Sequence, residues 1–300
     1  MATLERIGTQ IDIVGESPVW HDSQRALYWV DIRRPALRRL DFDSGRVDTW
    51  PMPSLVGTTV ICDDDRLLVA LSDRIALFDP STLTFETIAR PERRIEGHRF
   101  NDGRCDRQGR LWVGTMHNIT RAPEGMLCRL EDTGALRQMR SGICIPNSLA
   151  WSPDGRTMYF ADSLRYAIFA YAYDIESGEI RNERVFASTT PPCFPDGSAV
   201  DAEGYLWNAE FNASRIVRYT PSGHVDRIVE LATRRPTCCA FGGPDLDILY
   251  ITTCSQEMSP AELAAEPDAG ALLAIRPGIR GLPEPRFRVA PRSTAMESPA

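Results

Sequence analysis

Six polar residues with oxygen-bearing side chains recur at one position of a repeated pattern in this chain. Each lies four residues before an apolar residue that precedes a turn, within or beside a largely apolar stretch. They are Glu16, Thr58, Asn101, Asn147, Asp196 and Thr237. Two carboxylates and two amides held together would suit a divalent cation such as Ca²⁺, Mg²⁺ or Mn²⁺, with Zn²⁺ or Fe²⁺ also open. A cation would also offset the repulsion between the carboxylates.

Each of these residues also has a plainer interpretation. A single Asn or Asp at the start of a strand is usually a turn or backbone cap, and Asn147 after Pro146 or Asp196 before Gly197 fits that description. The shared position in all six copies favours a common site instead. We expect Thr58 and Thr237 to be structural, or at most to line a channel.

A unit of four short strands repeats along the chain and would position these residues. An apolar residue begins the second strand of each unit, and successive copies lie 40, 44, 47, 48 and 43 residues apart. These residues are Leu27, Leu67, Leu111, Met158, Leu206 and Leu249. Six such units predict an all-β fold, a six-bladed β-propeller with four-stranded antiparallel blades. The first strand of each blade would line the central channel, so the six polar side chains should converge there.

The chain ends and one insertion complete this prediction. We expect the segment near residues 4–7 to add an outer strand to the last blade, which would extend to about Val289 and close the ring. The stretch from Ser255 to Gly270 is expected to be an insertion with a helical turn. Residues 1–291 would then form one domain, and residues 292–300 a disordered tail.

The composition limits the class of protein. Hydrophobic residues at 43% and charged residues at 25% are typical of a soluble globular protein. Because no apolar run reaches the roughly 20 residues of a membrane span and the N-terminus lacks a signal-like core, we expect a cytoplasmic protein without a membrane partner. The net charge of -7 disfavours nucleic acid. Eight cysteines without a Cys-x-x-Cys pair predict reduced thiols. We expect a monomer or a weak homo-oligomer.

Several motifs, in order, resemble those of the SMP-30/gluconolactonase/LRE family of sugar lactonases and regucalcin-like proteins. They are Gly15–Trp20, Arg99–Gly103, Gly114–Met116, Asn147–Gly155 and Pro195–Gly197. The resemblance covers nearly the whole chain and implies a six-bladed propeller with one catalytic divalent metal. It implies that Glu16, Asn147 and Asp196 hold the metal, and that Arg99 and Asn101 bind a sugar lactone.

One departure from the family pattern concerns the substrate. Some members carry a substrate-contacting acid shortly after the Gly-Thr-Met motif, where this chain has His117, Asn118 and Ile119. His117 could contact substrate, but a single His is more often a hydrogen-bonded surface residue. The departure leaves the identity of the sugar open, rather than the reaction.

The expected function is metal-dependent hydrolysis of an aldonolactone to its aldonic acid. The cation would polarise the lactone carbonyl and activate a water, Asp196 would help to accept the proton, and Arg99 and Asn101 would orient the ring hydroxyls. One alternative is a non-enzymatic, calcium-binding propeller, and another is a metal-dependent aryl-ester or organophosphate hydrolase on the same fold. Arg99 beside Asn101 favours an enzyme, since a structural metal gains nothing from an adjacent cation.

Overall fold

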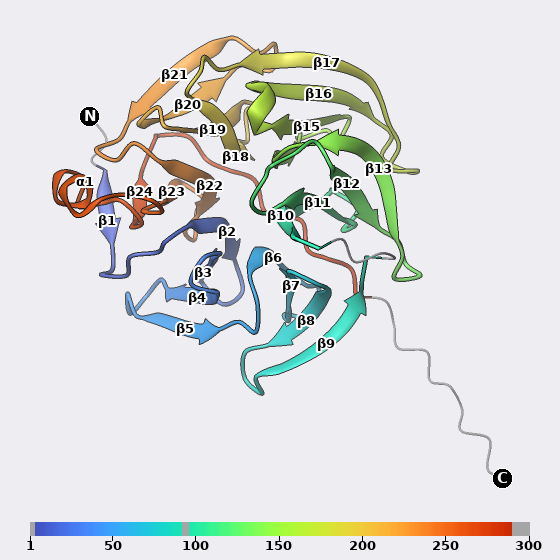
Figure 1. Ribbon diagram of the computed structural model, residues 1–300, viewed down its shortest axis with the longest axis horizontal. Coiled ribbons are helices and arrows are strands. Elements are labelled where there is room, and N and C mark those ends of the chain that lie inside the picture. The colour runs from blue at the N-terminus through green and yellow to red at the C-terminus, as the bar shows by residue number, and fades with distance from the viewer. Residues whose placement is uncertain (1–3, 92–95, 290–300) are drawn as a thin grey trace.

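Six four-stranded antiparallel sheets form a ring around a central channel in the computed structural model, which describes residues 4–91 and 96–289 (Figure 1). The first strand of each blade lies innermost, and the later strands follow outward. The apolar residues used to define the repeat lie within one residue of the start of each second strand. The predicted six-bladed propeller is therefore confirmed.

Five blades take their strands consecutively from the chain. Blade 1 contains β2 (Gly15–His21), β3 (Ala26–Asp31), β4 (Ala36–Asp41) and β5 (Val47–Pro51). Blade 2 contains β6 (Val56–Ile61), β7 (Leu67–Leu71), β8 (Ile75–Asp79) and β9 (Thr84–Ala89). Blade 3 contains β10 (His98–Cys105), β11 (Leu111–His117), β12 (Gly125–Leu130) and β13 (Leu136–Ile143). Blade 4 contains β14 (Pro146–Trp151), β15 (Thr157–Asp162), β16 (Ala167–Tyr173) and β17 (Ile180–Ser188), with the 3-10 helix η1 (Ser163–Arg165) after β15. Blade 5 contains β18 (Phe194–Val200), β19 (Leu206–Phe211), β20 (Arg215–Tyr219) and β21 (Val225–Glu230).

The sixth blade combines three strands from the C-terminal part of the chain with one from its N-terminal part. It contains β22 (Pro236–Gly242), β23 (Ile248–Thr253), β24 (Leu272–Ile275) and, as its outer strand, β1 (Glu5–Ile7). β1 runs antiparallel to β24, with Glu5 opposite Ala274 and Ile7 opposite Leu272. This pairing closes the ring and covers an edge strand that would otherwise be free to pair with another chain. The expected N-terminal closing strand is confirmed.

The insertion between β23 and β24 contains the short helix α1 (Pro260–Ala265). Ser259 and Glu262 form a reciprocal capping box at its start, and Pro260 occupies the first turn. These residues satisfy free N–H groups and fix the backbone, which explains why the helix begins there. The expected helical turn is therefore present. Within residues 4–91 and 96–289, no helix is long and apolar enough to cross a bilayer.

The core lies between neighbouring blades. Aromatic side chains from the second strands, Trp29, Trp112 and Trp207, are almost fully buried there. Of the eight cysteines, Cys144 and Cys193 are half-buried and the others are buried, and all eight are free thiols. These side chains pack as small apolar groups, as the sequence predicts.

The chain after β24 does not extend the last blade, which corrects the expectation that this blade reaches about Val289. The segment crosses the centre of the ring instead (red in Figure 1). Gly281 pairs with Asp201, and Phe287 pairs with Cys62, at the ends of two inner strands. A side chain at position 281 would meet the Cβ of Phe241 at 2.1 Å, so the close approach requires glycine. The segment covers one end of the channel. The expected tail, residues 292–300, lies outside the described residues.

Candidate active site

The inner strand of every blade has a bulge at, or directly beside, the repeated polar position. In β2 the shift in pairing follows Glu16, in β14 it follows Asn147, and in β18 it follows Pro195. In the other three inner strands the pairing register shifts at the equivalent place. A bulge bends the strand and redirects its side chains. The bulges thereby turn carboxylate and amide groups out of the sheets and into the channel.

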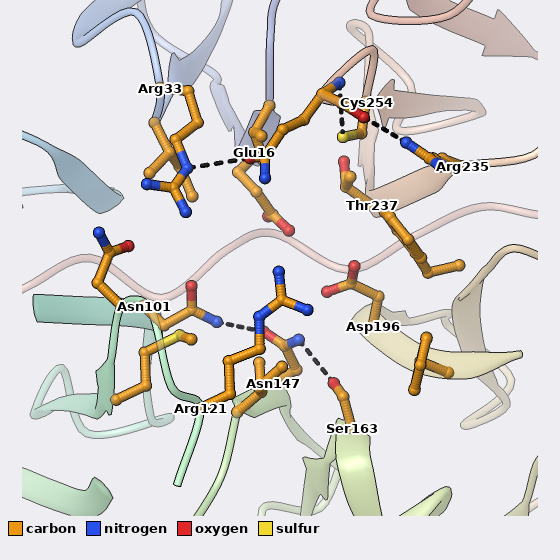
Figure 2. Close-up of a pocket in the computed structure, with 18 of the residues that line it drawn as sticks. Glu16, Arg33, Asn101, Arg121, Asn147, Ser163, Asp196, Arg235, Thr237 and Cys254 are labelled. Carbon is orange, nitrogen blue, oxygen red and sulfur yellow. Dashed lines mark hydrogen bonds between the residues drawn. The ribbon is translucent and has the colours of Figure 1, made fainter. Parts of the chain in front are cut away.

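Five of the six repeated polar residues line one cavity of about 280 Å³ at the end of the channel where the inner strands begin. They are Glu16, Asn101, Asn147, Asp196 and Thr237. Figure 2 shows Glu16, Asn147 and Asp196 pointing toward a common space from three different blades. The structure thus brings together the residues that the sequence assigned to the metal.

The two repeated threonines hold neighbouring blades together. Thr58 Oγ1 donates to the Gly103 carbonyl at 2.8 Å and lies 2.7 Å from Ser17 Oγ. Thr237 Oγ1 donates to the Gly15 carbonyl. Thr58 does not line the cavity, whereas Thr237 does. Their contacts agree with the structural role expected for both and the channel-lining role allowed for Thr237.

A chain of hydrogen bonds crosses three blades at the cavity floor. Arg99 Nη1 donates to Asn101 Oδ1 at 2.7 Å, and Asn101 Nδ2 donates to Asn147 Oδ1 at 2.8 Å. Asn147 Nδ2 donates to Ser163 Oγ at 2.9 Å, and Ser163 Oγ donates to the Pro195 carbonyl at 2.7 Å. The chain fixes the orientation of the Asn147 amide. It also couples the residues expected to bind substrate to those expected to bind the metal.

Ser163 is a positioning residue that sequence reasoning missed. It lies in η1, outside the repeated strands, so no periodic signal marks it. We expect Ser163→Ala to weaken cation affinity about 10- to 100-fold, because the Asn147 amide loses the contact that orients it. Calorimetric titration of a divalent cation would measure this, with Ser222→Ala in an exposed turn as the control. Unchanged affinity in Ser163→Ala would contradict the role.

The electrostatics of the two carboxyls favour a bound cation. Burial, followed by the charge of Asp102, raises the pKa of Glu16 to about 8, although Oε2 accepts a hydrogen bond from the Ser17 amide at 2.7 Å. Burial and the neighbouring Glu16 raise the pKa of Asp196 well above its usual value. A divalent cation between them would remove the cost of ionising both.

The donor set also fits a cation that prefers oxygen. In the part of the chain that the structure describes, no group of three or more His, Cys, Asp or Glu side chains could hold a metal ion. A three-residue metal site here would therefore combine the carboxylates of Glu16 and Asp196 with the amide oxygen of Asn147. Carboxylate and carbonyl oxygens are the ligands that suit Ca²⁺, Mg²⁺ and Mn²⁺. Structural zinc sites instead use thiolate and imidazole ligands.

The cation-free protein should lose stability as the pH rises. The folded state keeps a proton on Glu16 between about pH 4.5, its unfolded pKa, and about pH 8, its folded pKa, whereas the unfolded state has released it. The free energy of unfolding should therefore fall across this window, by on the order of 1 kcal/mol per pH unit for each proton. Urea denaturation of chelator-treated protein would measure the slope. Glu16→Gln should make the slope shallower, and a flat or rising wild-type profile would contradict the assignment.

Hydrogen bonds from Nε and Nη1 hold the Arg99 guanidinium in place and leave Nη2 available to donate. Nε donates to Asn118 Oδ1 at 2.9 Å, and Nη1 donates to the Phe100 carbonyl at 2.9 Å in addition to Asn101. Nη2 makes no hydrogen bond to any residue within the described ranges. Burial, followed by the charge of Arg33, lowers the pKa of Arg99 to about 9, so the guanidinium stays charged at neutral pH. Arg99 can therefore donate to a ligand in the cavity.

Residues at the end of the Gly-Thr-Met motif and directly after it differ in whether they line the cavity. Met116 and Asn118 line the cavity, whereas His117 does not. His117 packs against Gly97, and Nδ1 accepts hydrogen bonds from the Ile119 and Thr120 amides at 3.3 and 3.1 Å. The structure thus places Asn118 rather than His117 beside Arg99. Substrate contact by His117 stays a prediction without support from this geometry.

A comparison with known families identifies the chain. Residues 14–255 match the sequence model of the SMP-30/gluconolactonase/LRE-like region. The chain belongs to this family. The SMP-30/gluconolactonase relatives include 6-deoxy-6-sulfogluconolactonase of Pseudomonas putida, 36% identical over 95% of this chain and 98% of the relative. L-arabinolactonase of Azospirillum brasilense is 38% identical over 93% of each chain.

A solved structure matches the fold closely. The crystal structure of a calcium-binding protein, regucalcin, from Agrobacterium tumefaciens superposes with a TM-score of 0.90 at 29% identity. The match covers 95% of this chain and 97% of that chain. The family assignment predicted from the motifs is confirmed.

Proposed function

We propose that this chain hydrolyses a sugar lactone to the corresponding aldonic acid with the help of one divalent cation. The observation that carries the proposal is the convergence of Glu16, Asn147 and Asp196 on a cavity that also contains the held, charged guanidinium of Arg99 (Figure 2). The named relatives support the reaction class, since two of them are lactonases that act on different sugars.

Glu16, Asn147 and Asp196 would hold the cation. When bound, it would supply Lewis-acid polarisation of the lactone carbonyl and lower the pKa of a nearby water. We propose Ca²⁺ first, because the donors are oxygens and the similar solved protein is described as calcium-binding. Mg²⁺, Mn²⁺, Zn²⁺ and Fe²⁺ remain alternatives for the test.

The side chains of this protein would do the remaining work. Asp196 is half-buried and faces the cavity, so its carboxylate can take a proton from a water that attacks the lactone. Arg99 Nη2 would bind ring oxygens or developing negative charge. Asn101 has both amide protons engaged, with the Pro146 carbonyl and Asn147. Its side-chain oxygen accepts from Arg99 Nη1. We therefore propose that Asn101 contributes mainly by positioning Arg99 and Asn147.

The cavity wall favours a hydroxylated substrate over an aryl ester. Phe194, Phe211 and Leu164 form an apolar part of the wall, but most of the lining residues are polar or charged. Polyhydroxylated rings need many hydrogen-bonding partners, whereas an aryl group needs a mainly apolar site. A non-enzymatic role in cation binding would not account for a charged guanidinium in the cavity, because a positive charge beside a metal site weakens cation binding.

A hydrolysis screen would test the proposal. We expect metal-stripped protein to be inactive toward a panel of aldono-1,4- and 1,5-lactones in a pH-indicator assay, and to regain activity when a divalent cation is added. Phenyl acetate and paraoxon would test the aryl-ester and organophosphate alternatives in the same assay. Absence of lactone hydrolysis with every cation would overturn the proposal.

A further inference from the structure

Four arginines line the cavity and come from separate parts of the chain. Arg99 lies in β10, Arg33 follows β3, Arg121 follows β11, and Arg235 directly precedes β22. Figure 2 shows Arg33 and Arg235 on opposite sides of the view, and Arg121 drawn over the space between Glu16 and Asp196. The role proposed for Arg99 does not explain the other three.

The contacts of these arginines are with neutral groups. Arg33 Nε donates to Gln256 Oε1 at 3.0 Å, and Arg235 Nη1 donates to the Gln256 carbonyl. The Arg121 side chain makes no hydrogen bond or ion pair with any residue in the described ranges. None of the four forms a salt bridge there, although many other arginines in the same ranges do, such as Arg218 and Arg286. Gln256 thus holds two guanidinium groups in place without neutralising them.

The cavity has an excess of positive charge. Its described lining contains four arginines but only three carboxylates, Glu16, Asp196 and Glu257. A divalent cation on Glu16 and Asp196 would increase the excess. The like charges act on one another, because Arg33 and Arg121 both contribute to the lowered pKa of Arg99. A neutral lactone would leave this repulsion in place, whereas an anion would relieve it.

We propose that the preferred lactone carries an anionic group away from its carbonyl, a carboxylate, sulfonate or phosphate, which Arg33, Arg121 and Arg235 bind. Planar guanidinium groups suit all three anions because they donate parallel hydrogen bonds to paired oxygens. The inference rests on the proposed lactonase function and narrows its substrate class. It explains why arginines without salt-bridge partners lie in the same cavity as two carboxylates that would bind a cation.

A matched set of substrates tests the inference. The set is gluconolactone and its counterparts with a carboxylate, sulfonate or phosphate at C6, each assayed with cation-loaded enzyme. We expect at least one charged counterpart to exceed gluconolactone in kcat/KM by tenfold or more, and its identity names the anion. Arg33→Gln and Arg121→Gln should each lower kcat/KM for that substrate by about tenfold, mainly through KM, which matches the loss of one charge-assisted hydrogen bond. Gluconolactone should change by less than about threefold, since it makes no such bond.

Arg181→Gln, on the outer strand β17, is the control for a general loss of charge, and it should leave kcat/KM for both substrates unchanged. Equal or better use of gluconolactone by the wild type would overturn the inference, and so would equal losses for both substrates in the variants.

If no lactone is hydrolysed, the proposed function fails, and calorimetry then tests anion binding separately. Glucarate should bind more tightly than gluconate to the wild type but not to Arg121→Gln, and equal binding to the wild type would overturn the inference.

Discussion

Asp196→Asn is expected to lower kcat for lactone hydrolysis by about 10²- to 10⁴-fold, the range for removal of a general base. Asparagine keeps the size of the side chain and one oxygen ligand, but it cannot accept a proton at neutral pH. Asp196 is the carboxyl that is half-buried and open to the cavity, whereas Glu16 is buried. The loss should therefore appear in kcat even when the cation is saturating.

Measuring bound cation in the same samples separates the two roles of Asp196. If Asp196→Asn binds the cation but turns over slowly, Asp196 acts as a proton acceptor. If the variant loses both cation binding and turnover, Asp196 acts as a metal ligand only. Glu230→Gln, at an exposed position on β21, controls for the loss of one carboxylate. If Asp196→Asn kept wild-type kcat and cation content, neither role could stand.

Arg99→Met is expected to lower kcat/KM by about 10²- to 10³-fold, because a buried, preorganised charged donor is lost. Arg99→Lys should recover only part of the activity, since an ammonium cannot donate as Nε and Nη1 do and also present a third donor, Nη2, to the substrate. Assays of kcat and KM across the aldonolactone panel would measure both effects.

The same substitution removes hydrogen bonds to Asn101, Asn118 and the Phe100 carbonyl, so it should also cost about 1–3 kcal/mol of stability. Urea denaturation would show whether the variant remains folded under assay conditions. Wild-type kcat/KM in folded Arg99→Met would exclude Arg99 from the site.

The fold and the centre of the site were predictable because they depend on a repeat. The polar residue near the start of each inner strand keeps its register across copies, so Glu16, Asn147 and Asp196 could be aligned from the sequence alone. A propeller then brings equivalent positions to one channel. The bulges that turn these side chains inward recur at the same place in each blade, and they leave no separate signal in the sequence.

The rest of the site depends on segments without periodicity. Arg33, Arg121 and Gln256 lie in connections between strands, and their approach to the cavity follows from loop conformations that no pattern encodes. His117 ends β11 and Asn118 begins the turn after it, and only Asn118 lines the cavity. The path of the chain after Ile275 was also unpredictable, because contacts with several blades rather than a strand ladder hold it.

Lactonase activity and bound cation measured together, during titration of a divalent cation into chelator-stripped protein, test the central claim most directly. We expect activity to rise in proportion to bound cation and to reach its maximum at one cation per chain. Glu16→Gln should shift the titration to higher cation concentrations. Full activity in the stripped protein, or a cation that binds equally well to wild type and Glu16→Gln, would contradict the assignment of Glu16, Asn147 and Asp196 to a catalytic metal site.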